Sequence, residues 1–236
     1  MTYGGRRRDP GAITIETAHT LDRREGPYGE VVLRGRGEDF EIIANGCFLM
    51  DTSDGRSERL LVDAALDALP GGLTGPSLLI GGLGVGFSLA HAAAGPRWGA
   101  ITVVEREQAI IDWHLEGPLS RISGPALADP RTVILRTDLI AHIRDPAASY
   151  DALCLDIDNG PDWTVTEDNG GLYTPDGLSA CMDRIKPGGI LAVWSARPSP
   201  AFEDALRNAG FSGVRTEEIQ VARGVPDVVH LAVRPA

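Results

Sequence analysis

The sequence predicts an α/β fold in which a doubly wound, mostly parallel sheet follows a smaller β-rich segment. Before residue 57, short alternating apolar runs are separated by polar and glycine-rich turns, a pattern typical of antiparallel hairpins. After residue 57, apolar runs alternate with helix-like stretches, which indicates a parallel sheet covered by helices on both faces. The last two apolar runs have no helix between them, so they predict a C-terminal antiparallel hairpin.

The β-rich segment contains four runs with strand-like alternation, at residues 12–19, 28–35, 39–45 and 47–52. We expect them to form a small antiparallel sheet or a pair of hairpins. We therefore divide the chain into a small N-terminal β-rich domain of residues 1–56 and a second domain of residues 57–236.

The second domain begins with an amphipathic helix at 57–69, for which Ser57 is the expected N-cap and Pro70 a stop signal. The remaining expected helices fall at 86–94, 106–115, 174–185 and 199–210, with a short one from Asp138. The expected strands fall at 77–82, 100–105, 131–137, 150–158, 189–196, 214–222 and 227–235. This succession predicts a Rossmann-like sheet that ends in the antiparallel hairpin.

The composition is that of an ordinary globular protein, with 236 residues, 43% of them hydrophobic, and a net charge of −11. Such an acidic chain is a poor candidate for binding nucleic acid, which depends on cationic side chains at phosphates. No apolar run reaches the roughly 18 residues that a membrane span requires. The three cysteines lie far apart, which is typical of a reducing compartment, so we expect a cytoplasmic protein.

A glycine-rich loop, Gly-Gly-Leu-Gly-Val-Gly at residues 81–86, connects the expected strand at 77–82 to the next helix. Glycines let a ligand approach the backbone, and the free amides at the start of a helix favour a polar or anionic group. The dinucleotide fingerprint needs a third glycine where Phe87 stands, which disfavours a NAD-dependent enzyme. The observed spacing of Gly82, Gly84 and Gly86 resembles the S-adenosylmethionine loop of class I methyltransferases; the alternative is a simple tight turn.

Two acids follow the next two expected strands. Glu105 ends the strand at 100–105, about 20 residues beyond the loop, where a carboxylate accepts hydrogen bonds from both hydroxyls of a ribose. Alternatively, Glu105 is an ordinary acidic residue at the N-terminus of the next helix, where the helix dipole favours negative charge. Asp138 stands where a strand ends and a helix begins, so it either caps that helix or accepts from an adenine amino group.

The expected strand at 150–158 ends in an unusually acidic stretch. Asp156 and Asp158 flank Ile157, and the two-residue period of a strand places both carboxylates on one side. Such a pair suits binding a cation or removing a proton from an attacking amine or hydroxyl. Around the following turn lie three candidate substrate-binding residues, Asn159, Asp162 and Trp163. Turn chemistry is the alternative explanation for this stretch. The five histidines are scattered, so no metal site is expected.

Together, the loop, the two strand-end acids and the acidic tip resemble spermidine synthase and its aminopropyltransferase relatives. The resemblance also covers the β-rich N-terminal segment, the lead-in at 48–66 and the segment 184–196, Arg-Ile-Lys-Pro-Gly-Gly-Ile-Leu-Ala-Val-Trp-Ser-Ala. It implies a homodimer that transfers an aminopropyl group from decarboxylated S-adenosylmethionine to an amine. It also implies cofactor contacts at Gly82, Gly84, Glu105 and Asp138, with Asp156 as the catalytic acid.

The chain departs from this family at three motifs. Gly84 stands where the family loop has an acid, and an acid there repels the carboxylate of intact S-adenosylmethionine. In the lead-in at 54–59, only Glu58 matches the family's acid-plus-Tyr-His-Glu pattern, and it is a candidate substrate-binding residue. The family's Asp-Ser-Ser-Asp-Pro becomes Asp-Ile-Asp-Asn-Gly-Pro at 156–161.

These departures favour a transferase that uses intact S-adenosylmethionine, most simply to methylate a small-molecule nucleophile. Asp156 or Asp158 then orients or deprotonates the acceptor. The first alternative is a true aminopropyltransferase of polyamine biosynthesis that uses the decarboxylated cofactor. A further alternative is a non-catalytic binding protein that has kept the fold.

Overall fold

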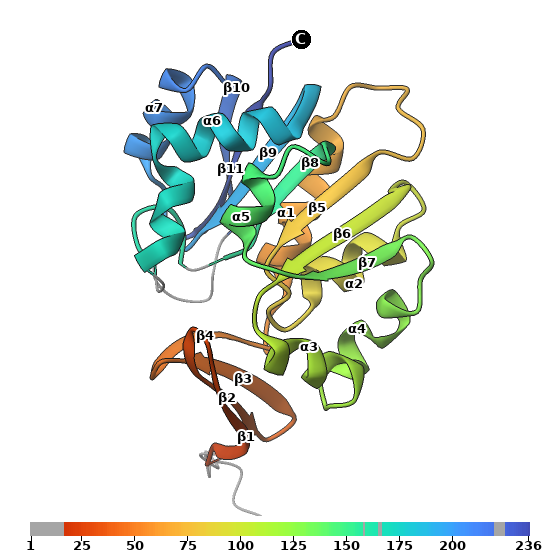
Figure 1. Cartoon of the computed structure of the whole chain (residues 1–236), viewed down its shortest axis with the longest axis vertical. Helices are drawn as coiled ribbons and strands as arrows, with labels where there is room; N and C mark the ends of the chain where they lie inside the picture. The colour runs from red at the N-terminus through yellow and green to blue at the C-terminus, as the bar shows by residue number, and fades with distance from the viewer. Residues whose placement is uncertain (1–16, 158, 165–166, 220–224) are drawn as a thin grey trace, which may run out of the picture.

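The structure, a computed structural model, describes residues 17–157, 159–164, 167–219 and 225–236. A four-stranded antiparallel sheet comes first, in the order β1-β2-β3-β4, and lies at one end of the molecule (Figure 1). Its strands are β1 (His19–Gly26), β2 (Gly29–Arg36), β3 (Asp39–Ala44) and β4 (Cys47–Asp51). Asn45 and Gly46 form the two-residue turn between β3 and β4, and both have positive φ, as such hairpin turns require.

The larger sheet has seven strands in the order β10-β11-β9-β8-β5-β6-β7. Its strands are β5 (Ser77–Gly81), β6 (Ala100–Glu105), β7 (Thr132–Arg136), β8 (Tyr150–Leu155), β9 (Ile185–Ser195), β10 (Ser212–Ile219) and β11 (Asp227–Val233). The pairs from β9 to β7 are parallel, whereas β11 pairs antiparallel with both β9 and β10. The predicted doubly wound sheet with its C-terminal hairpin is therefore confirmed.

Among the described residues, eight helical segments follow the small sheet: α1 leads into the larger sheet, and the other seven connect its strands (Figure 1). They are α1 (Arg56–Ala68), α2 (Phe87–Ala94), α3 (Gln108–Leu115), α4 (Ser120–Leu127), α5 (Leu139–Arg144), α6 (Pro175–Arg184), α7 (Pro200–Asn208) and the 3₁₀-helix η1 (Glu167–Tyr173). Those that pack on one face include α1 and α2, while α5, α6 and α7 cover the other. The strand order reverses between β5 and β8, which is the place where open α/β sheets bind ligands.

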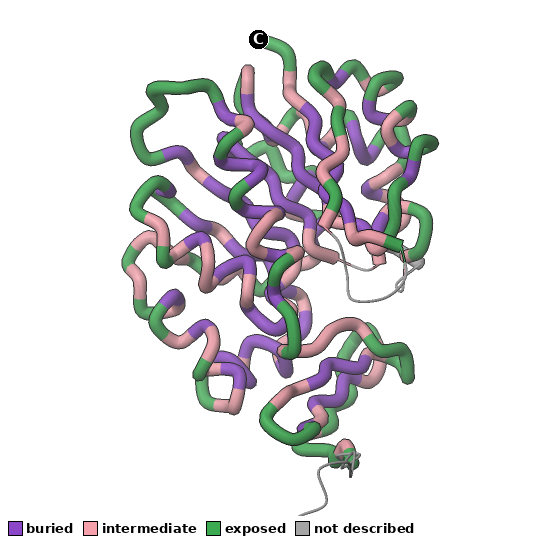
Figure 2. The backbone as a smooth tube through the Cα atoms, turned by 180° about the vertical axis from the view of Figure 1, so that it is seen from behind, coloured by how far each residue is buried: buried purple, intermediate pink, exposed green. Residues whose placement is uncertain are grey.

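The central strands are buried along most of their length (Figure 2). Their side chains supply two apolar clusters, one on each face of the sheet. Along β5, Leu78 and Ile80 point into the cluster beneath α1 and α2, whereas Leu79 points into the cluster beneath α6. The first cluster also contains Leu33 and Ile42 of the N-terminal sheet. One hydrophobic core therefore fixes the small sheet against the larger domain. The domain boundary at residue 56 remains a prediction.

The structure differs from the expected elements in three places. Residues 12–16 of the strand expected at 12–19 lie outside the described residues. Strand β1 begins at His19, the last residue of that range, and is a polar edge strand without apolar alternation. Helix α4 was not predicted, because Gly124 and Pro125 within it are turn signals. Gly55, rather than Ser57, caps α1, and the Ser57 hydroxyl instead donates to Asp227.

Candidate functional site

The glycine loop crosses from β5 to α2 at the carboxyl edge of the larger sheet. Gly82, Gly84 and Gly86 have φ values of 91°, 50° and 93°, a region that side chains rarely adopt. A Cβ on Gly82 would stand 2.5 Å from the backbone oxygen of Asp156, and one on Gly86 would stand 2.7 Å from the His114 ring. The loop therefore requires glycine at these positions both for its conformation and for its close contacts.

Glu105 binds the backbone of the loop from the end of β6. One carboxylate oxygen accepts from the amide of Leu83 at 3.0 Å, and the other accepts from the amide of Glu107 at 2.8 Å. The side chain is only 7% exposed, and burial raises its pKa. Because each carboxylate oxygen has two lone pairs, Glu105 retains acceptor capacity toward a ligand beside the loop.

A central cleft of about 370 Å³ opens beside this loop, between the N-terminal sheet and the carboxyl ends of β5, β6 and β8. Among the residues that line it are Met50, Glu58, Gly82, Gly84, Glu105 and Asp156. Asp138 also lines the cleft, but one of its oxygens accepts from the amide of Ala141 at 2.9 Å and so caps α5. The capping role expected for Asp138 is thus observed, and an adenine contact remains a prediction for its second oxygen.

Glu58 and Asp156 form a pair of interacting carboxyl groups in the cleft. Glu58 comes from the first turn of α1 and is 9% exposed, while Asp156 directly follows β8. Burial, reinforced by the negative charge of Asp156, raises the pKa of Glu58 to about 8. Burial also raises the pKa of Asp156 to about 6, against the opposing effect of a hydrogen bond from Ser88. At neutral pH the pair therefore shares one proton and carries one negative charge.

Comparison with known proteins found no matching family model and no matching curated protein. Among solved structures, spermidine synthase from Thermotoga maritima matches with a TM-score of 0.72 and 14% identity, covering 91% of this chain and 72% of that chain. A spermidine synthase in complex with the transition state analogue AdoDATO matches with a TM-score of 0.74 and 16% identity, covering 91% of this chain and 73% of that chain. This chain has the fold of spermidine synthase. The predicted resemblance in fold is thereby confirmed, for a divergent sequence.

Within the spermidine-synthase fold, the acidic stretch after β8 is only partly directed at the cleft. Asn159 lines the cleft, and its backbone bonds to Trp163 and Ala196 hold the turn. Trp163 is 62% exposed, and neither it nor Asp162 is among the residues that line the cleft. Asp158, the second expected catalytic acid, lies outside the described residues. A substrate-binding role for Asp162 and Trp163 remains a prediction without a contact that supports it.

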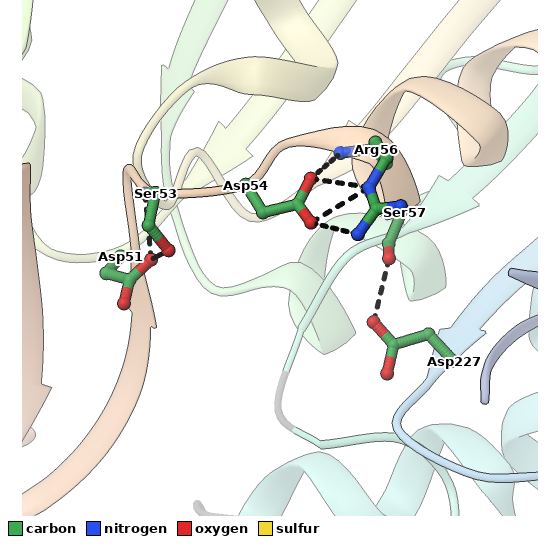
Figure 3. A network of polar contacts seen from close by, with 6 residues as sticks. All are labelled: Asp51, Ser53, Asp54, Arg56, Ser57 and Asp227. Atoms are coloured by element: carbon green, nitrogen blue, oxygen red, sulfur yellow. Dashed lines mark hydrogen bonds and ion pairs between the residues drawn. The ribbon is translucent and has the colours of Figure 1, made fainter. Parts of the chain in front are cut away.

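Sequence reasoning missed five residues of this site. Met50, Asp54, Trp194 and Asp227 line the cleft, and Ser88 lies behind it, hydrogen-bonded to Asp156. A side chamber of about 190 Å³ shares Asp54, Glu58, Trp194 and Asp227 with the cleft. Its wall is held by a forked ion pair from Arg56 to Asp54 and by the hydrogen bond from Ser57 to Asp227 (Figure 3). No local pattern marks these five residues as part of a site, although Met50, Asp54 and Trp194 lie in segments that the family resemblance covers.

The described residues contain no group of three or more side chains suited to holding a metal ion. Among the described helices, none is long and apolar enough to cross a membrane. Cys47, Cys154 and Cys181 are free thiols, two of them buried.

Proposed function

We propose that the chain transfers the aminopropyl group of decarboxylated S-adenosylmethionine to a small-molecule amine. The observation that carries this proposal is the Glu58–Asp156 pair, which stands beside a glycine loop with a buried acid on the neighbouring strand. The two solved structures of similar fold are spermidine synthases, so the comparison favours aminopropyl transfer over the methyl transfer that the sequence favoured.

The loop and Glu105 fit the adenosine part of such a donor. Gly82 and Gly84 line the cleft and have no side chains, so a ligand can approach the backbone of the loop closely. Glu105 retains lone pairs toward the cleft for hydroxyl donors, as described above. These features bind and orient the donor, and its sulfonium supplies the electrophilic carbon.

The paired carboxyl groups fit the acceptor. Attack by an amine nitrogen forms a carbon–nitrogen bond as the carbon–sulfur bond breaks, leaving a neutral thioether and a proton to be removed from nitrogen. Asp156 is ionised near neutral pH, so it can accept this proton or hold the incoming ammonium. Ser88 holds the carboxylate in place through a 2.7 Å hydrogen bond.

The same pair favours a donor without a carboxylate on its tail. A tail that passes the loop meets Glu58 and Asp156, and a carboxylate beside this partly buried, negatively charged pair is repelled more strongly than in water. The ammonium of a decarboxylated tail is attracted instead. This electrostatic difference supports the decarboxylated donor.

Methyl transfer from intact S-adenosylmethionine is the second candidate. It is favoured by Gly84, which places no acid on the loop to repel the carboxylate of the intact cofactor. The two candidates leave different thioethers: aminopropyl transfer leaves methylthioadenosine, and methyl transfer leaves S-adenosylhomocysteine.

The test is to incubate the purified protein with each donor and a panel of primary amines, and to identify the thioether by mass spectrometry. We expect methylthioadenosine from the decarboxylated donor, with kcat reduced at least 100-fold by Asp156→Asn. Asp183→Asn serves as a matched control, since Asp183 is exposed on α6. Formation of S-adenosylhomocysteine alone would refute aminopropyl transfer and support methyl transfer. Failure of both donors to bind would refute both reactions.

A further inference from the structure

Met50 enters the cleft because of an irregularity in the small sheet. The register between β3 and β4 shifts at one point, so that Ile43 pairs with Phe48 but Ile42 pairs with Met50. Leu49 is therefore an extra residue, and a bulge of this kind re-aims the side chains that follow it. Met50 consequently shares the face of Ile42, which is completely buried in the main core, whereas Phe48 is exposed.

The Met50 side chain covers the glycine loop. Its sulfur lies 3.2 Å from the backbone nitrogen of Val85 and accepts the hydrogen bond of that amide. A Cβ on Gly84 would stand 2.3 Å from the same sulfur, so the thioether fills the space beside this glycine. The place where a side chain of residue 84 would project is thus occupied by a side chain from the other sheet.

The opposite side of the loop is held more firmly. The Nε2 of His114 lies 2.8 Å from the carbonyl oxygen of Gly84, and its Nδ1 lies 2.6 Å from the hydroxyl of buried Ser123. Met50, by contrast, is unbranched and flexible, and sulfur is a weak hydrogen-bond acceptor. Compared with the contact made by His114, the contact made by Met50 is therefore the one that substitution can alter without displacing the loop.

We propose that Met50 is a specificity-determining residue that excludes a carboxylate-bearing donor tail from the loop; this inference rests on the proposed function. The amide of Val85 stands just before the N-terminus of α2, where backbone N–H groups favour an anion. Because the thioether occupies this amide and the space at Gly84, a carboxylate cannot reach it. The ammonium of a decarboxylated tail needs no such donor and is held by the acids across the cleft.

The inference is tested by calorimetric titration of wild type, Met50→Ala and Met50→Leu with intact and with decarboxylated S-adenosylmethionine. Wild type is expected to bind the decarboxylated form more tightly. Met50→Ala frees the Val85 amide and the space at Gly84. The variant should therefore bind the intact form at least tenfold more tightly than wild type does, which reduces the preference for the decarboxylated form. Met182→Ala is the control, because Met182 is a partly buried methionine on α6 that does not line the cleft.

Met50→Leu separates the two ways in which Met50 can act. Leucine keeps the volume of the side chain but removes the sulfur acceptor. An unchanged preference for the decarboxylated donor then indicates that Met50 excludes the carboxylate by its volume. A reduced preference indicates that the sulfur competes with the carboxylate for the Val85 amide. If Met50→Ala does not fold, Met50→Val takes its place, because valine also shortens the side chain and removes the sulfur. A donor preference that stays within twofold of wild type in every folded Met50 variant, while both donors still bind, overturns the inference and leaves the proposed function intact. Failure of wild type to bind either donor refutes the proposed function itself.

Discussion

The hydroxyl of Ser88 donates a hydrogen bond of 2.7 Å to Oδ2 of Asp156, and thereby joins the first turn of α2 to the end of β8. Ser88 is almost completely buried, so water cannot easily replace it as the donor. The bond favours the ionised form of Asp156 and lowers its pKa against the opposing effect of burial. Ser88, which belongs to none of the motifs identified in the sequence, thus lowers the pKa of the carboxyl group to which we assign the proton transfer.

Ser88→Ala should shift the pH dependence of the reaction. Loss of the hydrogen bond destabilises the carboxylate, so the pKa of Asp156 rises above its value of about 6. The acidic limb of the log(kcat/KM) profile should therefore move to higher pH by roughly one unit, which corresponds to about 1.4 kcal/mol. Steady-state kinetics between pH 5 and 9 measure the shift. An unchanged limb with a uniformly lower rate would mean that Ser88 only supports packing.

Glu58→Gln should remove a pH-dependent loss of stability. The pKa of Glu58 is raised to about 8 in the folded chain, above the value near 4.5 of an unfolded one. Between these values the folded state binds the extra proton, so the free energy of unfolding falls as the pH rises from about 4.5 to 8. Glutamine cannot ionise, and we expect the variant to be more stable than wild type at pH 9, by about 1 kcal/mol or more.

Urea denaturation at pH 5, 7 and 9 measures this difference for wild type, Glu58→Gln and a control variant. Glu38→Gln is the control, since Glu38 is exposed in the turn between β2 and β3. Its stability relative to wild type should vary little with pH. If Glu58→Gln behaves like this control, the carboxyl pair is not buried as described.

The order of elements in the larger domain was predictable because buried parallel strands are continuous apolar runs. Glu105 could be located for a similar reason, since the carboxyl ends of neighbouring parallel strands meet at one edge of the sheet. Asp156 follows a third such strand, β8, which pairs with β5. Residues at the ends of parallel strands can therefore be assigned to the site from the sequence alone.

The remainder of the cleft depends on contacts between segments that no local pattern connects. Met50 reaches the loop only because of a bulge, and nothing in the alternation of residues 47–52 indicates an extra residue. Ser88 and Asp227 likewise acquire their roles from packing across the sheet. The sequence-based argument considered only the missing acid at Gly84, and it could not foresee that Met50 fills the space beside this glycine.

Gly82→Ala should both destabilise the chain and abolish donor binding. The added methyl group would stand 2.5 Å from the backbone oxygen of Asp156, at a φ of 91° that alanine rarely adopts. We expect a loss of at least about 2 kcal/mol in unfolding free energy. Gly124→Ala is the matched control: no atom lies within 4 Å of the added Cβ, and the site is helical, so stability should stay equal or rise by up to about 1 kcal/mol. Thermal denaturation and donor titration of the two variants should therefore diverge.

His114→Gln should weaken donor binding and reduce the acid sensitivity of the fold. His114 is buried, and burial lowers its pKa below the usual 6.5, so the folded chain keeps the ring neutral while the unfolded chain protonates it. Its contribution to stability is therefore complete above about pH 6.5 and is lost progressively as the pH falls from there through the lower pKa of the folded state. Glutamine removes this dependence but disturbs the contact with the carbonyl of Gly84, which loosens the loop. Urea denaturation should show that the free energy of unfolding differs less between pH 5 and pH 7.5 in the variant than in wild type. Donor affinity should fall several-fold. His91→Gln is the control: the His91 ring is partly exposed and pairs with Asp63, so this change should leave donor affinity unchanged.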